Sequence, residues 1–275
     1  MTFGARLREA IDSRGPLCAG IDPHPALMDQ WGLTDSAFGL EKFAMTAVEA
    51  LGGTVAAVKP QSAFFERHGS QGIAVLEKVI AEARGMGALV VLDVKRGDIG
   101  STAQAYADAY LDQSSPLAVD AITASPFLGF SSLDPMFDTA LANDAGVFVL
   151  ALTSNPEGAQ VQHATTGDGR TVSATILDAI ATRNVDADTL GSIGAVVGAT
   201  IGERGENLDV NGPLLVPGVG AQGGTVDDVR RIFGSAVRNV LPSSSREILV
   251  TGPDKGTLRA AAEQLLRGFS ALVDA

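Results

Sequence analysis

Short apolar runs recur along the 275-residue chain and alternate with longer segments of helical periodicity. Within each run the apolar residues are continuous rather than alternating with polar ones, which is typical of parallel strands covered on both faces. Each run therefore predicts one strand of a parallel sheet. The eight runs cover residues 17–22, 55–60, 88–94, 118–124, 146–152, 193–199, 213–219 and 238–243.

Between the runs, apolar residues recur every three or four positions, the spacing of one helix face. This spacing is clear in residues 72–86, 226–233 and 257–273. Strands that alternate with helices predict βα units, and eight such units can close into a (β/α)8 TIM barrel. An open, doubly wound α/β sheet is the alternative, because the number of strands alone does not separate the two.

No linker-like change of composition and no tandem repeat interrupts this pattern, so residues 1–275 are predicted to form one domain. The longest gap between strand-like runs, 154–192, holds a polar stretch, 160–170, with glycines and a histidine. We expect residues 157–172 to be an inserted loop with an exposed turn, followed by the fifth helix of the barrel. The pattern assigns this insertion no function.

Composition narrows the class of protein. The net charge is −12 and no Lys/Arg-rich run occurs, which argues against a nucleic-acid footprint or a polybasic membrane contact. A single cysteine excludes an intramolecular disulfide and a cysteine-based metal cluster. No apolar run approaches the roughly 18 residues of a membrane span, and the N-terminal segment lacks the features of a signal peptide. We expect a cytoplasmic protein.

Charged side chains gather where the first three predicted strands end. Asp22 ends the first strand, Lys59 the second, and Asp93 and Lys95 the third, with Asp98 in the turn that follows. A single Asp at such a place is usually a cap or turn residue, and a single Lys is usually solvated. Neither explanation covers several charges at successive strand ends. Because neighbouring carboxylates and ammonium groups shift each other's pKa values, we expect a catalytic site at this end of the barrel.

A glycine-rich segment, residues 216–225, follows the seventh predicted strand. Its backbone N–H groups could approach an anion, and Thr225 and Asp228 are spaced as a capping box at the start of the next helix. The loop after the eighth strand supplies Arg246, which suits bidentate binding of phosphate. We expect a phosphate site between these two loops. His24, His68 and His163 show no metal-ligand spacing, and each is expected to be a loop or surface residue. His24 flanks the end of the first strand, so contact with the site is the alternative for this histidine.

The segment DVKRGDIGST (93–102) resembles the D-x-K-x-x-D-[IV]-x-x-T signature of the orotidine 5′-phosphate decarboxylase family. The similarity extends to GID (20–22), VKP (58–60) and PGVGAQGG (217–224), so it covers essentially the whole chain. The segment Thr153–Pro156 and the overall length resemble the longer, mainly bacterial branch of the family.

The resemblance implies a TIM-barrel enzyme that converts orotidine 5′-monophosphate to uridine 5′-monophosphate, the last step of de novo pyrimidine nucleotide synthesis. It implies no cofactor and no metal. Lys95 would protonate C6 of the pyrimidine as carbon dioxide leaves, and Asp93 and Asp98 would lie close to the substrate carboxylate. Lys59 would complete the charged network and contact the ribose.

The resemblance also implies the groups that bind substrate. Asp22 would accept a hydrogen bond from a ribose hydroxyl, and Ser154 would contact the edge of the pyrimidine. In this family the active site is completed across a homodimer interface, so Asp98 and Thr102 would reach the substrate of the neighbouring subunit. The base and the phosphate would be bound by Gln222, and the phosphate alone by Gly223, Gly224 and Arg246.

Three other interpretations are open. The same D-x-K-x-x-D strand occurs in sugar-phosphate barrels such as 3-keto-L-gulonate 6-phosphate decarboxylase and hexulose-phosphate synthase, which use a divalent metal and carry Glu at the second strand end. Lys59 stands at that position here and would repel the metal. A non-catalytic phosphate binder would be expected to have lost at least one of the charged positions. Charges that only stabilise a dimer would leave turnover independent of Lys95.

Overall fold

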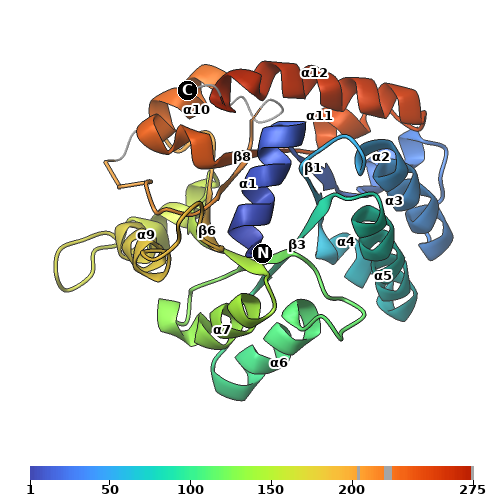
Figure 1. Ribbon diagram of the computed structural model, residues 1–275. Helices are drawn as coiled ribbons and strands as arrows, with labels where there is room; N and C mark the ends of the chain where they lie inside the picture. Colours follow the sequence, from blue (N-terminus) through green and yellow to red (C-terminus); the bar gives the residue numbers. More distant parts are fainter. Residues whose placement is uncertain (203–204, 220–224, 274–275) are drawn as a thin grey trace.

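The chain folds into a closed barrel of eight parallel strands surrounded by helices (Figure 1). The computed structural model describes residues 1–202, 205–219 and 225–273. The strands follow one another around the barrel in chain order, and pairing of Cys18 with Ser243 closes it between the first and last strands. The strands are β1 (Cys18–Ile21), β2 (Ala57–Pro60), β3 (Leu89–Arg96), β4 (Ala121–Ala124), β5 (Gly146–Leu152), β6 (Ile193–Val197), β7 (Leu214–Pro217) and β8 (Val240–Ser244).

Each predicted run thus coincides with one strand, although β3 and β8 extend past the predicted ends to Arg96 and Ser244, and the closed barrel is confirmed over the open sheet. The helical periodicity of residues 72–86, 226–233 and 257–273 corresponds to α5 (Gly69–Gly85), α10 (Val226–Phe233) and α12 (Lys255–Val273). Within the described ranges, no helix has both the length and the apolar character required to cross a membrane. The α-helices are α1 (Phe3–Arg14), α2 (Pro25–Gln30), α3 (Ala37–Leu51), α4 (Ser62–Glu66), α5 (Gly69–Gly85), α6 (Gly100–Leu111), α7 (Asp134–Ala142), α8 (Ala159–Gln162), α9 (Val172–Arg183), α10 (Val226–Phe233), α11 (Arg246–Leu249) and α12 (Lys255–Val273); the 3-10 helices are η1 (Phe130–Leu133), η2 (Pro156–Gly158) and η3 (Gly234–Asn239).

The strands are buried on both faces, and the period of two divides their side chains between two apolar clusters. Cys18, Ala57 and Val91 belong to the cluster inside the barrel, while the intervening side chains pack outward against the helices. Two residues beyond Ala57 and Val91, the same alternation brings Lys59 and Asp93 to the inside. The strands therefore place these charges above an apolar floor.

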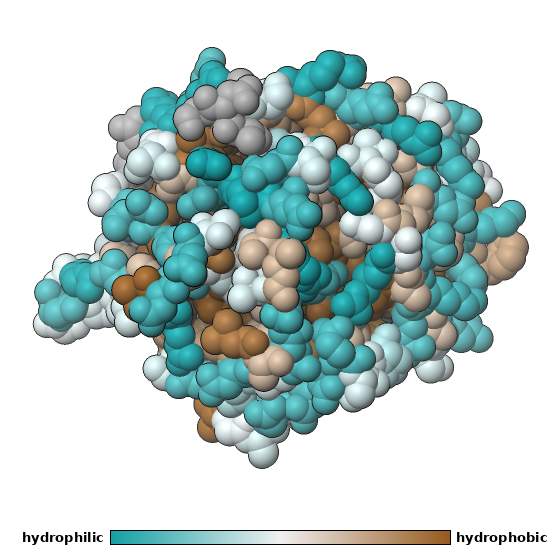
Figure 2. All heavy atoms as spheres, viewed as in Figure 1, coloured by the Kyte–Doolittle hydropathy of each residue, from teal (hydrophilic) through white to brown (hydrophobic). Residues whose placement is uncertain are grey.

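Helix α1 closes the N-terminal opening of the barrel, across which it lies in Figure 1. Phe3, Leu7 and Ile11 are almost completely buried and belong to the inner cluster. The Phe3 ring meets Phe148 of β5 edge to face, with centroids 6.0 Å apart, and Gly146 leaves room for it, since a Cβ there would lie 2.2 Å from the ring. In Figure 2, this side of the molecule is mainly hydrophilic with small separate apolar patches. Because α1 covers the N-terminal opening, a ligand site can form only at the opposite, C-terminal opening of the barrel.

The predicted insertion at 157–172 contains η2, α8 and a tight turn. A single antiparallel bridge between Thr165 and Thr171 closes the turn, in which Gly169 has a φ of +82°. The turn is exposed, as expected. At its other end, the Gln162 side chain donates to Thr153 Oγ1 (2.7 Å) and accepts from the Thr153 backbone N–H (2.9 Å). The insertion is thereby tied to the first residue after β5.

Candidate active site

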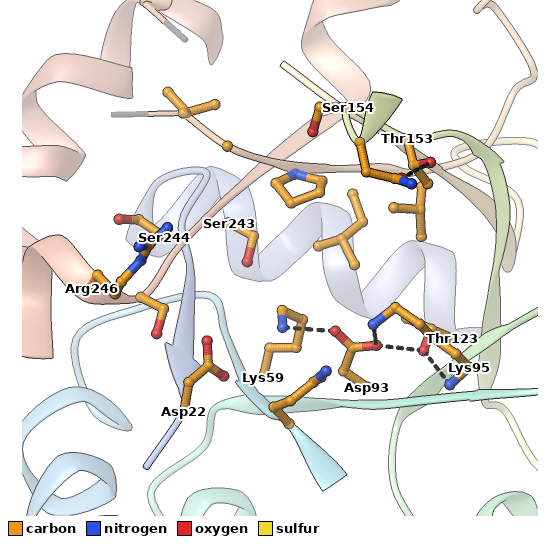
Figure 3. A pocket seen from close by; sticks show the side chains of 18 of the residues that line it. Asp22, Lys59, Asp93, Lys95, Thr123, Thr153, Ser154, Ser243, Ser244 and Arg246 are labelled. Atoms are coloured by element: carbon orange, nitrogen blue, oxygen red, sulfur yellow. Dashed lines mark hydrogen bonds and ion pairs between the residues drawn. The ribbon is translucent and has the colours of Figure 1, made fainter. Parts of the chain in front are cut away.

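A cavity of about 1030 Å³ opens at the C-terminal end of the barrel, where barrel enzymes carry their catalytic groups. Figure 3 shows the side chains that surround it. Residues from both ends of the chain meet here because the strands close into a ring. Six of the residues predicted from the sequence line the cavity: Asp22, Lys59, Asp93, Lys95, Ser154 and Arg246.

Asp93 lies between two lysines. Its Oδ1 is 2.6 Å from Lys95 Nζ, and its Oδ2 is 3.0 Å from Lys59 Nζ. The side chains of Asp93 and Lys59 are about nine-tenths buried, whereas the Lys95 side chain is 46% exposed to the cavity. Two ammonium groups and one carboxylate thus form a continuous charged array, with Lys95 presented to a ligand.

Burial and charge oppose each other in this array. Burial alone would raise the pKa of Asp93, but the charges of Lys59 and Lys95 outweigh it and lower the pKa to about 2. For Lys59, burial favours the neutral amine, yet Asp93 and Asp22 outweigh it and raise the pKa above its ordinary value. Both groups are therefore ionised at neutral pH.

Two neutral side chains complete the environment of Asp93, and neither was predicted. The Thr123 hydroxyl of β4 donates to Oδ1 (2.8 Å). The Gln61 amide, oriented with its nitrogen toward the carboxylate, donates to Oδ2 (2.7 Å). Each carboxylate oxygen thus accepts one hydrogen bond from a lysine and one from a neutral donor. In the sequence Thr123 stands out only as a hydroxyl near the end of the apolar run 118–124, and no local pattern indicates that it meets Asp93.

The far side of the cavity is rich in hydroxyl groups. Ser243 and Ser244 are buried at the end of β8, and Arg246 begins α11 with its side chain exposed to the cavity. In Figure 3, Ser244 and Arg246 lie across the cavity from Lys95 and Thr123. Hydroxyls beside a guanidinium suit an anionic group such as phosphate. Three further residues predicted to bind there, Gln222, Gly223 and Gly224, lie outside the described residues.

Two oxygens at the site are buried without a hydrogen-bond partner among the described residues: Asp22 Oδ1 and Ser245 Oγ. A buried polar atom with no partner is costly in a folded protein. Both residues line the cavity. A ligand hydroxyl or phosphate oxygen placed here would remove that cost.

His24 belongs to the rim of the cavity. It is an exposed loop residue, as expected, and it lines the cavity and packs against Phe64, with ring centroids 4.3 Å apart. The reason is local: β1 ends at Ile21, and the residues that follow form the rim of the cavity before α2 begins at Pro25.

Asp98 and Thr102 do not line the cavity of their own chain. The four charges at the strand ends, Asp22, Lys59, Asp93 and Lys95, do meet at this opening, whereas Asp98, in the turn after β3, lies outside it. Beyond β3, Gly97 packs tightly on the backbone of Ser125, and Asp98 Oδ1 accepts a hydrogen bond from the Ile99 N–H (2.8 Å). Thr102, in the first turn of α6, is exposed. Over the described residues, no group of three or more His, Cys, Asp or Glu side chains is arranged to hold a metal ion.

Comparison with protein-family models gives a match over residues 15–261 to the Orotidine 5′-phosphate decarboxylase / HUMPS family. The matched range contains all eight strands and every residue of the charged array. An orotidine 5′-phosphate decarboxylase from Salinispora arenicola is 63% identical over 266 residues, which cover 96% of this chain and 96% of its own. The enzyme of the same name from Streptomyces coelicolor is 59% identical over 263 residues, 95% of each chain.

Solved structures agree with the sequence relatives. A Streptomyces avermitilis protein assigned to the same activity is 58% identical and superposes with a TM-score of 0.97, covering 100% of this chain and 96% of its own. The Leishmania donovani OMP decarboxylase is 32% identical, with a TM-score of 0.79 and full coverage of both chains. The similarity therefore extends over the barrel, the cavity and the insertion.

Proposed function

This chain belongs to the orotidine 5′-phosphate decarboxylase family, and on that premise we propose that it converts orotidine 5′-monophosphate to uridine 5′-monophosphate and carbon dioxide. In pathway terms this is the last step of de novo pyrimidine nucleotide synthesis. The observation that carries the proposal is the Lys59–Asp93–Lys95 array, with Lys95 exposed to a cavity whose far side carries Arg246. The array supplies a positioned proton donor, and the far side suits a phosphate.

The proposed chemistry needs an ammonium beside C6 of the pyrimidine. The bond between C6 and the carboxylate carbon breaks, carbon dioxide leaves, and the electron pair stays on C6 in an orbital that no attached carbonyl can delocalise. A preorganised cation next to that carbon stabilises the developing charge. Lys95 Nζ then transfers its proton to C6, which gives the product.

Asp93 would serve this reaction in two ways. Its pairing with Lys59 favours the charged form of that buried amine, and its ion pair with Lys95 fixes the position of Lys95 Nζ. Its negative charge would also lie near the substrate carboxylate. The repulsion between the two would raise the free energy of the bound substrate relative to that of the transition state. Since Asp93 is fixed by four donors before substrate arrives, little reorganisation is needed at the moment of reaction.

The remaining polar groups would place the nucleotide. Asp22 Oδ1, buried without a partner, would accept from a ribose hydroxyl, and Lys59 would contact the same sugar. Ser154, on the segment after β5 that Gln162 anchors through Thr153, would contact the pyrimidine edge. Gln222, Gly223 and Gly224 would join Arg246 around the phosphate. The phosphate would lie far from the bond that breaks, and the free energy of its binding would help to assemble the active site around the pyrimidine.

Arg246→Ala is expected to weaken substrate binding more than turnover. Loss of a charge-assisted contact to phosphate costs about 1.5–3 kcal/mol, so KM should rise roughly 10- to 100-fold. Steady-state kinetics on orotidine 5′-monophosphate would measure this, with Arg238→Ala, whose side chain lies outside the cavity lining, as the matched control. An unchanged KM in Arg246→Ala would refute its phosphate role.

We propose further that the enzyme is a homodimer whose active sites are shared. Asp98 and Thr102 lie outside the cavity of their own chain, on the same rim as the exposed apolar side chains Ile99, Phe127 and Leu128. The two loops that carry these residues adjoin, since the Ser125 N–H donates to the Arg96 carbonyl. A second copy of the chain would cover this apolar rim and receive Asp98 and Thr102 at its own substrate.

Mixing two inactive variants tests the shared site. In a dimer of Lys95→Ala with Asp98→Ala, one site contains both changes and the other contains neither. Random exchange of subunits makes half of the dimers mixed, so activity should return to about a quarter of the wild-type level. Each variant alone is expected to stay inactive under the same assay.

The matched control mixes Lys95→Ala with Asp93→Asn. Both residues belong to the cavity of their own chain, so every site in the mixed dimer keeps one change and no activity should return. Recovery with the Asp98 pair but not with this pair would support sharing. If exchanged subunits of the Asp98 pair stay inactive, Asp98 does not act across the interface.

The direct test of the proposed function is loss of the orotidine 5′-monophosphate absorbance band on adding the purified protein in the presence of a chelator. Rapid loss is expected. The metal-dependent sugar-phosphate reaction predicts instead no loss with chelator, and activity on a keto sugar phosphate once magnesium is restored. The position of Lys59 is evidence against this metal-dependent reaction, because its ammonium forms an ion pair with Asp93 and would repel a divalent cation.

A further inference from the structure

We infer that Thr123 is a positioning residue for the decarboxylation: its hydroxyl joins the backbone of Lys95 to the carboxylate of Asp93 and so fixes where the Lys95 ammonium stands. The inference rests on the proposed function and deepens it. It assigns a role to a neutral side chain of β4, and this residue lies outside the signature segment 93–102.

The argument begins with an irregularity in the sheet. Leu92 of β3 pairs with Ile122 of β4, and Arg96 pairs with Ala124, so the register shifts between them. Three residues of β3 therefore face a single residue of β4, which is Thr123. The bulge contains Asp93 and Lys95, and bulges of this kind redirect side chains next to active sites.

The bulge has a conformational cost at Lys95. Its φ of +46° lies in the left-handed region, which is unfavourable for a residue that carries a Cβ atom. Such a conformation persists only where the surroundings fix it. Because the register shift removes the regular ladder partner, the Lys95 backbone N–H donates instead to Thr123 Oγ1, at 2.9 Å. The Thr123 hydroxyl thus replaces a ladder hydrogen bond.

The same hydroxyl donates its proton in a hydrogen bond to the carboxylate of Asp93. Thr123 Oγ1 donates to Asp93 Oδ1 at 2.8 Å, and that oxygen also accepts from Lys95 Nζ at 2.6 Å. Backbone N–H, hydroxyl, carboxylate and ammonium therefore form a closed ring through two residues of β3 and one of β4. Thr123 is only 1% exposed, so water cannot easily replace it. Without the hydroxyl, both the left-handed backbone and the Asp93 side chain lose a constraint.

Thr123→Val tests the inference, since valine keeps the shape and removes both hydrogen bonds. A displacement of the ammonium by about 1 Å can cost roughly 100-fold, so kcat should fall by about 10- to 100-fold. The dissociation constant for uridine 5′-monophosphate, measured by calorimetry, should change less than about threefold, because the phosphate and ribose contacts remain. Thr123→Ser restores the hydroxyl and should recover kcat to within about fivefold of wild type.

The controls separate this inference from the proposed function. Thr182→Val removes a hydroxyl from the exposed face of α9 and should keep wild-type kcat. If Thr123→Val does not fold, Thr123→Ala provides the same loss of hydroxyl and the same expectation. Wild-type kcat in the folded valine or alanine variant, or a serine variant as slow as valine, would overturn the role of Thr123 alone. A wild-type protein that does not turn over orotidine 5′-monophosphate would overturn the proposed function, and the inference with it.

Discussion

Lys95→Ala is expected to lower kcat for decarboxylation by about 10⁴-fold or more, the largest effect of any single change. The substitution removes the member of the charged array whose side chain is most exposed to the cavity. It deletes a proton donor, worth about 10²–10⁴-fold, and a cation beside the developing carbanion, worth about 10²–10³-fold. Binding of uridine 5′-monophosphate should remain measurable, since the phosphate end of the cavity is unchanged.

Single-turnover measurement of the absorbance loss would quantify the effect, and calorimetry would measure nucleotide binding. Lys78→Ala is the matched control, because that lysine forms a surface ion pair with Glu41 away from the cavity. The fold should tolerate Lys95→Ala well, as the side chain is half exposed. Decarboxylation at near wild-type rate in this variant would show that the charges only stabilise the structure.

Asp93→Asn is expected to reduce both activity and stability. Lys59 would remain buried and charged with its nearest anion gone, a change that typically costs about 3 kcal/mol in the free energy of unfolding. Loss of the anion between the two amines would also release Lys95 from its position, so kcat should fall by about 10³-fold or more. Urea unfolding and steady-state kinetics would measure the two effects separately.

The pH dependence of this stability difference has a definite sign. Because the folded-state pKa of Asp93 is lowered to about 2, its contribution is fully present above the unfolded value of 3.8 and is lost as pH falls toward 2. The stability gap between wild type and Asp93→Asn should therefore be constant between pH 5 and 7. It should narrow by about 1 kcal/mol at pH 3. A gap that is the same at pH 3 and pH 6 would contradict the ionic role of Asp93.

The barrel was predictable because its signal is local. Each strand is a short apolar run buried on both faces, and each intervening helix shows one apolar face. Lys59 and Asp93 were predictable for the same reason: charges at the ends of buried runs are rare and must meet at one end of a barrel. The period of two then places them inside.

The parts that were missed depend on how neighbouring strands pair and on where loops turn. Thr123 acts at Asp93 only because a register shift sets one residue of β4 against three of β3, and no local pattern encodes that shift. Gln61 and His24 reach the site through the directions taken by the chain after β2 and β1.

The burial of Cys18 has a practical consequence for measuring motion in this protein. It is the only cysteine in the sequence, it is fully buried in the inner cluster, and burial raises the pKa of its thiol to about 12. A thiol that is neither accessible nor ionised does not react with maleimides or methanethiosulfonates. A cysteine introduced at an exposed position, such as Val161→Cys in α8, would therefore be labelled selectively. The native chain can thus carry spin or fluorescent probes without first being made cysteine-free.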